Sequence, residues 1–395
     1  MYNEKACELG TNRSCIRELF EYGAMRAAVV GAQNVYDYSL GNPSIPAPPQ
    51  VNEAVKALVD ETNSVSLHGY TTATGDLHTR RAIAEDLNRR FDADVKPEDL
   101  FITCGAAPAL TAVFRALAVP GAQIIAIAPY FPEYKPFVEG AGAVFKVAQA
   151  DIPDFQINIK ALEAQITSAT AAVIVNSPNN PSGAVYTEKT LNALASLLRQ
   201  KARQYGHPIY IISDEPYREL VYDGVQAPFI PRLYEDTVMC YSYSKSLSLP
   251  GERIGYIYVN AQARDSKQLF AAIAGAARQA GHVCAPSLWQ KVIARCAHVR
   301  PDLASYEKNR RTLYEGLCAC GYEVVKPDGA FYLFVKAPGG DAVAFSKKAK
   351  RKDLLLVPSD DFGCRGYFRI CYCVSYDTIV RSLPIFRQLI QESIQ

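Results

Sequence analysis

From about residue 100 the chain alternates short apolar runs, rich in β-branched residues, with longer segments of helical periodicity. The expected strands are Leu100–Thr103, Gln123–Ala128, Val144–Val147, Ala171–Asn176, Ile209–Ser213, Thr237–Ser242 and Gly255–Val259. Helices are expected between several of them, for example over Ala107–Ala118 and Leu191–Gln204. Strands that alternate with helices and are apolar on both faces indicate an α/β fold with a mostly parallel, seven-stranded sheet covered by helices. Ligands of such sheets bind at the carboxyl ends of the strands.

The pattern changes after about residue 289, where it predicts a smaller α+β unit. A long helix is expected over Trp289–Leu317, followed by a hairpin within Tyr322–Val335 whose turn is Pro327-Asp328-Gly329. Leu354–Val357 and Tyr367–Val374 are expected to be further strands. This unit is predicted to form a separate domain.

The first part of the chain contains one predicted helix, Cys15–Val30, and then a proline-rich run from Gly41 to Pro49. Such a run fits neither a helix nor a central strand, so we expect an ordered connector. The predicted division is residues 1–48, belonging to the small domain; residues 49–288, the large domain; and residues 289–395, the small carboxyl-terminal domain.

Composition narrows the class of protein. The 395 residues carry a formal net charge of +2, with lysine and arginine scattered along the chain, which argues against nucleic-acid or membrane-surface partners. We see neither a bilayer-spanning apolar run nor a secretory signal, so we expect a cytoplasmic protein. The eleven cysteines and five histidines lack metal-ligand spacing, and we expect no metal and reduced, buried cysteines.

Polar motifs follow three successive predicted strands. The first strand ends in Asn176-Ser-Pro-Asn-Asn-Pro-Ser-Gly183 and the second in Ser213-Asp-Glu-Pro-Tyr217. The third ends in Ser242-Tyr-Ser-Lys245 and leads to Gly251-Glu-Arg253-Ile-Gly255. Each motif alone has an ordinary reading as a turn or a solvated side chain. Together they place a lysine, a carboxylate, polar donors and a cation at one edge of the sheet, a set that a pyridoxal-phosphate enzyme needs.

The combination N-x-P-N-N-P-S-G, D-x-x-Y, S-x-S-K and G-x-R-x-G resembles the pyridoxal-phosphate-dependent aminotransferases related to aspartate aminotransferase, and the resemblance runs along nearly the whole chain. It implies pyridoxal 5'-phosphate as the cofactor. It also implies that Lys245 holds the cofactor covalently and acts as the catalytic base, and that Asp214 keeps the pyridine nitrogen protonated.

Further cofactor contacts follow from the same resemblance. Asn180 and Tyr217 match the donors to the phenolic oxygen of the ring, and Ser242, Ser244 and Arg253 match phosphate ligands. The run Gly105-Ala106-Ala107 opens a helix directly after a strand, so its free amides can also receive the phosphate.

An aromatic side chain is expected to stack on the ring. Phe131 matches this position, with Tyr130 as the competing choice. Tyr70 is similar to the family tyrosine that reaches the phosphate of the neighbouring subunit, which implies a homodimer with shared active sites. By resemblance, the Ala128–Pro129 and Asn180–Pro181 bonds are both expected to be cis.

The substrate side is expected to depend on Arg369, in Tyr367-Phe-Arg-Ile, which matches the family arginine that binds the α-carboxylate. The backbone of Gly41 and the side chain of Asn180 are expected beside the same substrate. A dicarboxylate needs a second cation, for which Arg278 is the candidate. The preferred prediction is a ping-pong aminotransferase that uses L-aspartate as donor and 2-oxoglutarate as acceptor.

Several alternatives remain open at this point. A β-lyase acting on cystathionine or cysteine conjugates would share every cofactor residue, and the donor of an aminotransferase could instead be alanine or an aromatic amino acid. A pyridoxal-phosphate-binding regulator would need a DNA-binding domain, for which no residues are left over. The run Gly140-Ala-Gly-Ala-Val resembles a nucleotide-binding turn but lacks its third glycine.

Overall fold

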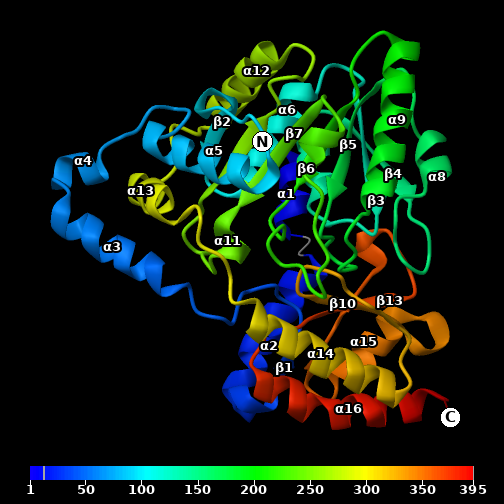
Figure 1. Ribbon diagram of the computed structural model, residues 1–395. Coiled ribbons are helices and arrows are strands. Elements are labelled where there is room, and N and C mark those ends of the chain that lie inside the picture. Colours follow the sequence, from blue (N-terminus) through cyan, green and yellow to red (C-terminus); the bar gives the residue numbers. More distant parts are fainter. Residues whose placement is uncertain (12–13, 395) are drawn as a thin grey trace.

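A seven-stranded sheet forms the centre of the computed structural model, which describes residues 1–11 and 14–394 (Figure 1). The strands lie in the order β2, β8, β7, β6, β5, β3, β4. Their bounds are β2 Leu100–Thr103, β3 Gln123–Ala128, β4 Val144–Gln149, β5 Thr170–Asn176, β6 Tyr210–Asp214, β7 Thr237–Ser242 and β8 Gly255–Val259. Only β8 runs antiparallel to its neighbours β2 and β7 in this sheet. The prediction of a mostly parallel sheet is confirmed.

Helices cover both faces of this sheet. On one face lie α6 Ala106–Leu117, α7 Tyr134–Gly140 and α12 Ser266–Gln279. On the other lie α5 Leu77–Phe91, α8 Ile159–Glu163, α9 Glu188–Tyr205, α10 Ile230–Leu233 and α13 Ser287–Cys296. Along β3, Ile124 packs with α6 whereas the next residue, Ile125, packs with α9. Successive side chains of a strand point to opposite faces, so this double cover requires the continuous apolar runs seen in the sequence.

A second, antiparallel sheet lies below the first in Figure 1 and has the order β12, β13, β10, β9. Its strands are β9 Val324–Val325, β10 Tyr332–Lys336, β12 Val357–Pro358 and β13 Tyr367–Cys371, and its helices are α14 Leu303–Cys320, α15 Ala342–Lys350 and α16 Tyr376–Ile394. A short strand from the amino-terminal part, β1 Tyr36–Asp37, pairs in parallel with β11 Leu354–Leu355. Both ends of the chain therefore contribute to this unit.

Two predicted elements of the smaller unit are wrong. The single helix expected over Trp289–Leu317 is two helices, α13 and α14, because Pro301 follows the end of α13 and cannot continue a helix. Asp302 then starts α14 by accepting hydrogen bonds from the amides of Ala304 and Ser305. The strand expected over Leu354–Val357 is divided between two sheets as β11 and β12.

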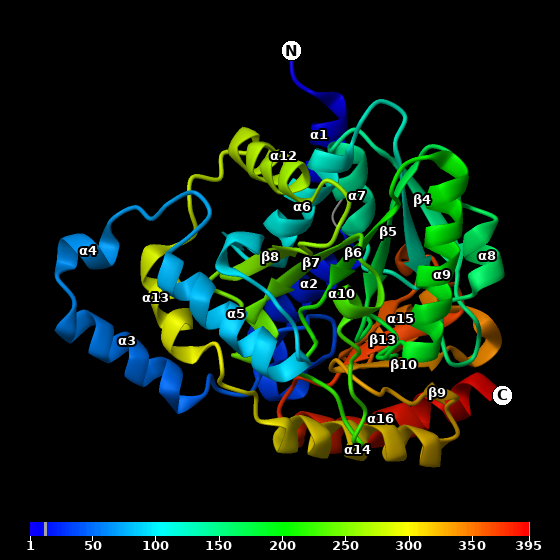
Figure 2. The same cartoon turned by 45° about the horizontal axis from the view of Figure 1, so that its top comes forward.

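Further helices lie toward the amino terminus. They are α1 Glu4–Thr11, α2 Cys15–Val30, α3 Pro49–Glu61 and α4 Ser64–His68. Helix α2 has the predicted bounds. Figures 1 and 2 show α3 and α4 extending away from the body of the molecule. Within the described ranges, no helix is long and apolar enough to span a bilayer.

None of the eleven cysteines, which all lie within the described residues, forms a disulfide. The expectation that they are buried is correct only for part of the set. The buried ones are Cys240, Cys296, Cys364, Cys371 and Cys373, and the others are partly or fully exposed. The two fully exposed cysteines, Cys7 and Cys318, lie on α1 and α14.

Candidate active site

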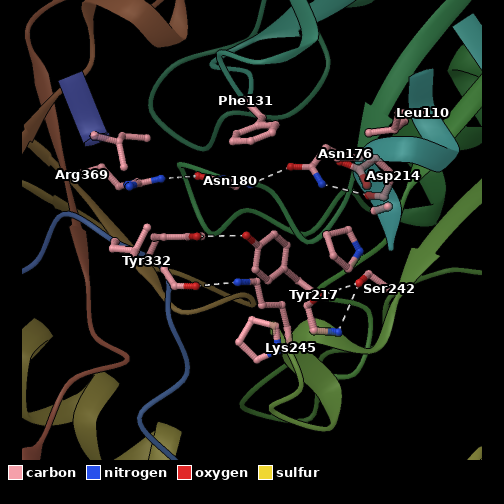
Figure 3. A pocket seen from close by; sticks show the side chains of 18 of the residues that line it. Leu110, Phe131, Asn176, Asn180, Asp214, Tyr217, Ser242, Lys245, Tyr332 and Arg369 are labelled. Atoms are coloured by element: carbon pink, nitrogen blue, oxygen red, sulfur yellow. Dashed lines mark hydrogen bonds between the residues drawn. The ribbon is translucent and has the colours of Figure 1, made fainter. Parts of the chain in front are cut away.

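A pocket of about 280 Å³ lies where the carboxyl ends of the parallel strands face the smaller sheet (Figure 3). Most of the predicted site residues line it, namely Gly41, Ala106, Ala107, Phe131, Asn180, Asp214, Tyr217, Ser242, Ser244, Lys245, Arg253 and Arg369. In Figure 3, Arg369 and Tyr332 enter from one side, Asp214 and Ser242 from the other, and Phe131 and Lys245 from above and below. Parallel strands bring these side chains together because their carboxyl ends share one edge.

Lys245 lies on α11 Tyr243–Ser246, a four-residue helix that directly follows β7. The Ser242 hydroxyl caps this helix by accepting a hydrogen bond from the Ser244 amide. The Lys245 Nζ donates a hydrogen bond to the carbonyl oxygen of Gly41 at 2.5 Å. Burial lowers the pKa of the Lys245 amine below its ordinary value. A lowered pKa increases the fraction of neutral amine, which is the form that acts as nucleophile or base.

Asp214, at the end of β6, is the buried carboxylate of the pocket. Its Oδ2 accepts a hydrogen bond from Tyr134 at 2.5 Å, and its Oδ1 is buried and has no hydrogen-bond partner among the described residues. Burial raises the pKa of Asp214 to about 7, although the Tyr134 bond opposes this, and the nearby Glu215 raises it further. A buried acceptor without a partner is costly, so Oδ1 fits a cationic N–H donor such as a protonated pyridine nitrogen.

Hydroxyls, a guanidinium and a helix amino terminus gather at a second part of the pocket. The Ser242 and Ser244 hydroxyls are 2.8 Å apart, and the Arg253 Nη1 donates to the Ser244 Oγ at 3.3 Å. Helix α6 begins beside them after Gly105, whose φ is +91°. A Cβ at Gly105 would lie 2.7 Å from the Arg253 Nη2, so only glycine leaves the guanidinium in place. Free amides, hydroxyls and a guanidinium form a suitable phosphate site.

Arg369, on β13, is a buried cation on the opposite side of the pocket, with only 2% of its surface exposed. Its Nη1 donates to the Asn180 Oδ1 at 3.0 Å and its Nη2 donates to the carbonyl oxygen of Ser39. Its guanidinium lies 4.6 Å from the centre of the Tyr332 ring. No carboxylate pairs with it among the described residues, and its Nε has no hydrogen-bond partner there. A guanidinium held in this way suits a bidentate carboxylate ligand.

Of the two competing aromatics, only Phe131 lines the pocket. Phe131 packs edge-on against Tyr134 with ring centres 5.6 Å apart, whereas Tyr130 turns away and packs against Phe145. The Tyr217 hydroxyl shares a hydrogen bond of 2.9 Å with the Tyr332 hydroxyl.

Three candidates are not among the residues that line this pocket. Tyr70 follows α4 and is 90% exposed, and Arg278 is exposed near the end of α12. Gly105 precedes the lining residue Ala106 in the chain. The two predicted cis bonds, Ala128–Pro129 and Asn180–Pro181, are confirmed, and Ile152–Pro153 and Ser177–Pro178 are also cis.

Several residues that line the pocket, or that contact the residues lining it, were not predicted from the sequence. Tyr332 and Tyr134 contact Tyr217 and Asp214, respectively, from elements far away in the sequence. The missed lining residues are Ile16, Leu40, Leu110, Asn176, Pro216, Pro250 and Tyr332. Asn176 was detectable because it begins the first motif, whereas Tyr332 looks like part of an ordinary apolar strand. No group of three or more His, Cys, Asp or Glu side chains in the described part of the chain is arranged to hold a metal ion.

Comparison with known proteins decides the family. The family model for aminotransferase class I and II matches residues 32–382. The chain belongs to this family. As a member of it, the chain is a pyridoxal-phosphate-dependent aminotransferase.

The aminotransferase resembles both curated relatives and solved structures. It is 30% identical to a probable aspartate/prephenate aminotransferase from Thermus aquaticus, over 89% of this chain and 90% of the relative. It is 29% identical to a probable N-acetyl-LL-diaminopimelate aminotransferase from Bacillus subtilis, over 89% and 88% of the two chains.

Among solved structures, an amino transferase from Eubacterium rectale is 52% identical, with a TM-score of 0.98 over 100% of both chains. Aspartate aminotransferase from Thermus thermophilus with maleate is 27% identical, with a TM-score of 0.86 over 98% of this chain and 99% of that one.

Proposed function

We propose that this aminotransferase moves an amino group from an L-amino acid to a 2-oxo acid in two half-reactions at the pocket around Lys245. The observation that carries the proposal is the buried Asp214 Oδ1, which has no hydrogen-bond partner among the described residues and lies in one pocket with Lys245 and Arg369. Pyridoxal phosphate, when bound, supplies the electron sink for cleavage of the Cα–H bond of the substrate.

The proposed cofactor contacts follow the family resemblance, and the shared pocket supports them. Asp214 would accept from the pyridine nitrogen, and Phe131 would cover one face of the ring. Ser242, Ser244, Arg253 and the amides after Gly105 would hold the phosphate. Asn180 and Tyr217 would donate to the phenolic oxygen. Each assignment uses a group whose hydrogen-bonding capacity or position is described above.

The chain's own residues then perform the proton transfer. Arg369 orients the substrate through its α-carboxylate, with the Gly41 backbone beside it. Lys245, whose amine has a lowered pKa, would take the proton from the substrate Cα. The wall of the pocket includes the apolar side chain of Leu110.

Replacement of the lysine tests this function. Lys245→Ala should abolish transamination and covalent cofactor attachment, because no other lysine lines the pocket within the described residues. The matched control is Lys189→Ala, on the exposed surface of α9, which should keep full activity. Activity in the Lys245 variant above a few per cent of wild type would place the catalytic amine elsewhere.

A half-reaction tests the two-step order. Donor added without acceptor should release one equivalent of 2-oxo acid per active site, because the amino group stays on the enzyme until an acceptor arrives. Continuous release of pyruvate and ammonia from a cysteine conjugate would instead indicate the β-lyase.

The preferred donor in this proposal is L-aspartate, with 2-oxoglutarate as acceptor. Relatives described as aspartate aminotransferases support it. The apolar lining residues Ile16, Leu40 and Leu110 favour the alternative that the donor is alanine or an aromatic amino acid. A screen with 2-oxoglutarate as acceptor and aspartate, alanine, phenylalanine, tyrosine or cystathionine as donor would decide between them.

Arg278 is the proposed partner of the distal carboxylate of aspartate. Because Arg278 lies outside the pocket of its own chain, this role requires a second copy of the chain. Arg278→Ala should then lower kcat/KM for aspartate much more than for alanine, since a carboxylate left unpaired in a pocket is costly. Arg203→Ala, on the exposed face of α9, is the control. Equal losses of kcat/KM for both donors would contradict a role of Arg278 in binding the distal carboxylate.

A further inference from the structure

Two cysteines lie beside the active site and have no role in the chemistry above. They follow the substrate-binding arginine in the run Arg369-Ile-Cys371-Tyr-Cys373. Alternate residues of a strand point to the same face, so Cys371 shares the pocket-facing side of β13 with Arg369. In the sheet, Cys371 pairs with Tyr332, a residue that lines the pocket.

The two thiols are already close together. The sulfur atoms of Cys371 and Cys373 are 2.8 Å apart, and both side chains are buried. Alternate Cα atoms of an extended chain are about 6.6 Å apart, which lies inside the range that a disulfide tolerates. A bond of about 2.05 Å would therefore need a small movement of the two sulfurs. The strand ends at Cys371, so Cys373 is not held by the ladder of β13.

The surroundings favour reaction at Cys371. Burial alone would raise the pKa of the Cys371 thiol, but the hydrogen bond from Cys373 and the charges of Arg369 and Lys245 outweigh burial, and the pKa lies below its ordinary value. The pKa of the Cys373 thiol is instead raised, first by burial. One sulfur of the pair is thus suited to be the nucleophile and the other to remain a thiol.

We propose that Cys371 and Cys373 are a modification site, at which a hydroperoxide converts the two thiols reversibly into a disulfide that lowers aminotransferase activity. The Cys371 thiolate attacks one peroxide oxygen, the O–O bond breaks, and a sulfenic acid and hydroxide form. The Cys373 sulfur then attacks the sulfenic sulfur, and the S–O bond breaks as the S–S bond forms, with release of water. The two sulfurs together lose two electrons, and the hydroperoxide is the species reduced.

The disulfide would act on the pocket in two ways. It converts the Cys371 thiol, whose pKa the charges of Arg369 and Lys245 lower, into a disulfide sulfur that cannot ionise. It also moves Cys373, whose sulfur lies 4.0 Å from the carbonyl oxygen of Leu40. Leu40 precedes Gly41, the residue that accepts the hydrogen bond of Lys245. A displacement of about 1 Å at a catalytic site can lower the rate roughly 100-fold.

The chain contains a matched control pair with the same spacing. Cys318 and Cys320 lie in the last turn of α14 and also have one residue between them. Residues two apart in a helix are about 200° apart around its axis, so their side chains point in different directions. Cys318 is exposed and Cys320 is partly exposed. This pair is easier for an oxidant to reach but lacks the geometry for a bridge.

The experiment treats the cofactor-loaded enzyme with hydrogen peroxide and then blocks the remaining thiols. Mass spectrometry of the digest should show a cross-link within the peptide that contains Cys371 and Cys373, lighter by two hydrogen atoms, and none between Cys318 and Cys320. Activity should fall roughly 10- to 100-fold and return with dithiothreitol. Each single variant, Cys371→Ser and Cys373→Ser, should lose the cross-link, and Cys371→Ser should also lose the response to dithiothreitol, because Cys371 is the sulfur that the peroxide oxidises first. Cys318→Ser should keep both.

The activity before dithiothreitol is divided by the activity after it within each variant. Differences in basal activity between variants therefore do not affect the comparison. Absence of the cross-link while Cys318 is oxidised would overturn the proposal, as would a cross-link that leaves activity unchanged. The cross-link is measured without turnover. An enzyme that forms it but never transaminates when reduced would therefore contradict the proposed function and not the thiol chemistry.

Discussion

The burial of Asp214 prepares this carboxyl for a ligand but lowers the stability of the cofactor-free protein near neutral pH. Its pKa is raised to about 7, mainly by burial, compared with an ordinary value of 3.8. The folded, cofactor-free protein therefore favours the protonated carboxyl. The stabilising effect of this preference is complete below pH 3.8 and is lost as the pH rises toward 7. Each unit of pKa shift corresponds to about 1.4 kcal/mol, so the loss amounts to up to about 4 kcal/mol.

Asp214→Asn should remove this loss. In urea unfolding of the cofactor-free protein, the variant should gain stability over wild type as the pH rises from about 4 to 7, with no further gain above that range. Asp60→Asn, at an exposed position of α3, is the control. Added pyridoxal phosphate should make wild type more stable than the variant, because the protonated nitrogen of the cofactor pairs only with the carboxylate. Parallel stability curves for wild type and variant across this pH range would contradict the prediction.

At the scale of elements, the start of α6 requires glycine at position 105, which the pattern of apolar residues does not reveal. Gly105 has a φ of +91°, and a Cβ there would lie 2.7 Å from the Arg253 Nη2. Gly105→Ala should therefore displace the guanidinium and weaken pyridoxal-phosphate binding roughly tenfold, by the loss of about one charge-assisted hydrogen bond. Equilibrium dialysis of the cofactor would measure the change.

A second glycine separates this effect from backbone strain. Gly121 also has a positive φ, +83°, but a Cβ there would have no neighbour within 4 Å. Gly121→Ala should cost stability through strain and leave cofactor affinity unchanged. Equal losses of affinity in both variants would mean that the loss at Gly105 comes from general destabilisation.

At the scale of the whole molecule, we propose a division into two domains with both chain ends in the smaller one. Tyr38 packs in the same apolar cluster as Phe386, which supports assigning residues 1–48 to the small domain. Helix α13 packs against α3 and α5, whereas α14 packs against α16. We therefore place the second boundary at the break near Pro301 rather than at residue 288.

The proposed homodimer also belongs to this scale. Helices α3 and α4 extend from the body (Figure 2), and Tyr70, which follows α4, is 90% exposed and does not line the pocket around Lys245. If Tyr70 completes the site of a second copy, refolding a mixture of Lys245→Ala and Tyr70→Ala chains should give more activity than either variant alone. Mixed dimers would then contain one intact site. A fully active monomer by light scattering, or no gain on mixing, would contradict the shared site.

The sequence alone was enough to predict the type of sheet, the strand ends that carry chemistry and the family. These depend on local patterns: apolar runs with helical spacers, and motifs within a few residues of each other. Lys245, Asp214 and Asn180 each stand at a strand end that could be placed from the chain alone, and parallel strands then bring them to one edge.

Only the tertiary structure decided which distant residues complete the pocket. Tyr134 contacts Asp214 and Tyr332 contacts Tyr217 across long stretches of sequence, and no local period encodes such contacts. The same is true of the close approach of the Cys371 and Cys373 sulfurs, since their spacing is identical to that of Cys318 and Cys320 in a helix. The first pair lies at and just beyond the end of β13 and the second lies within α14, so the backbone, and not the spacing, decides which pair can react.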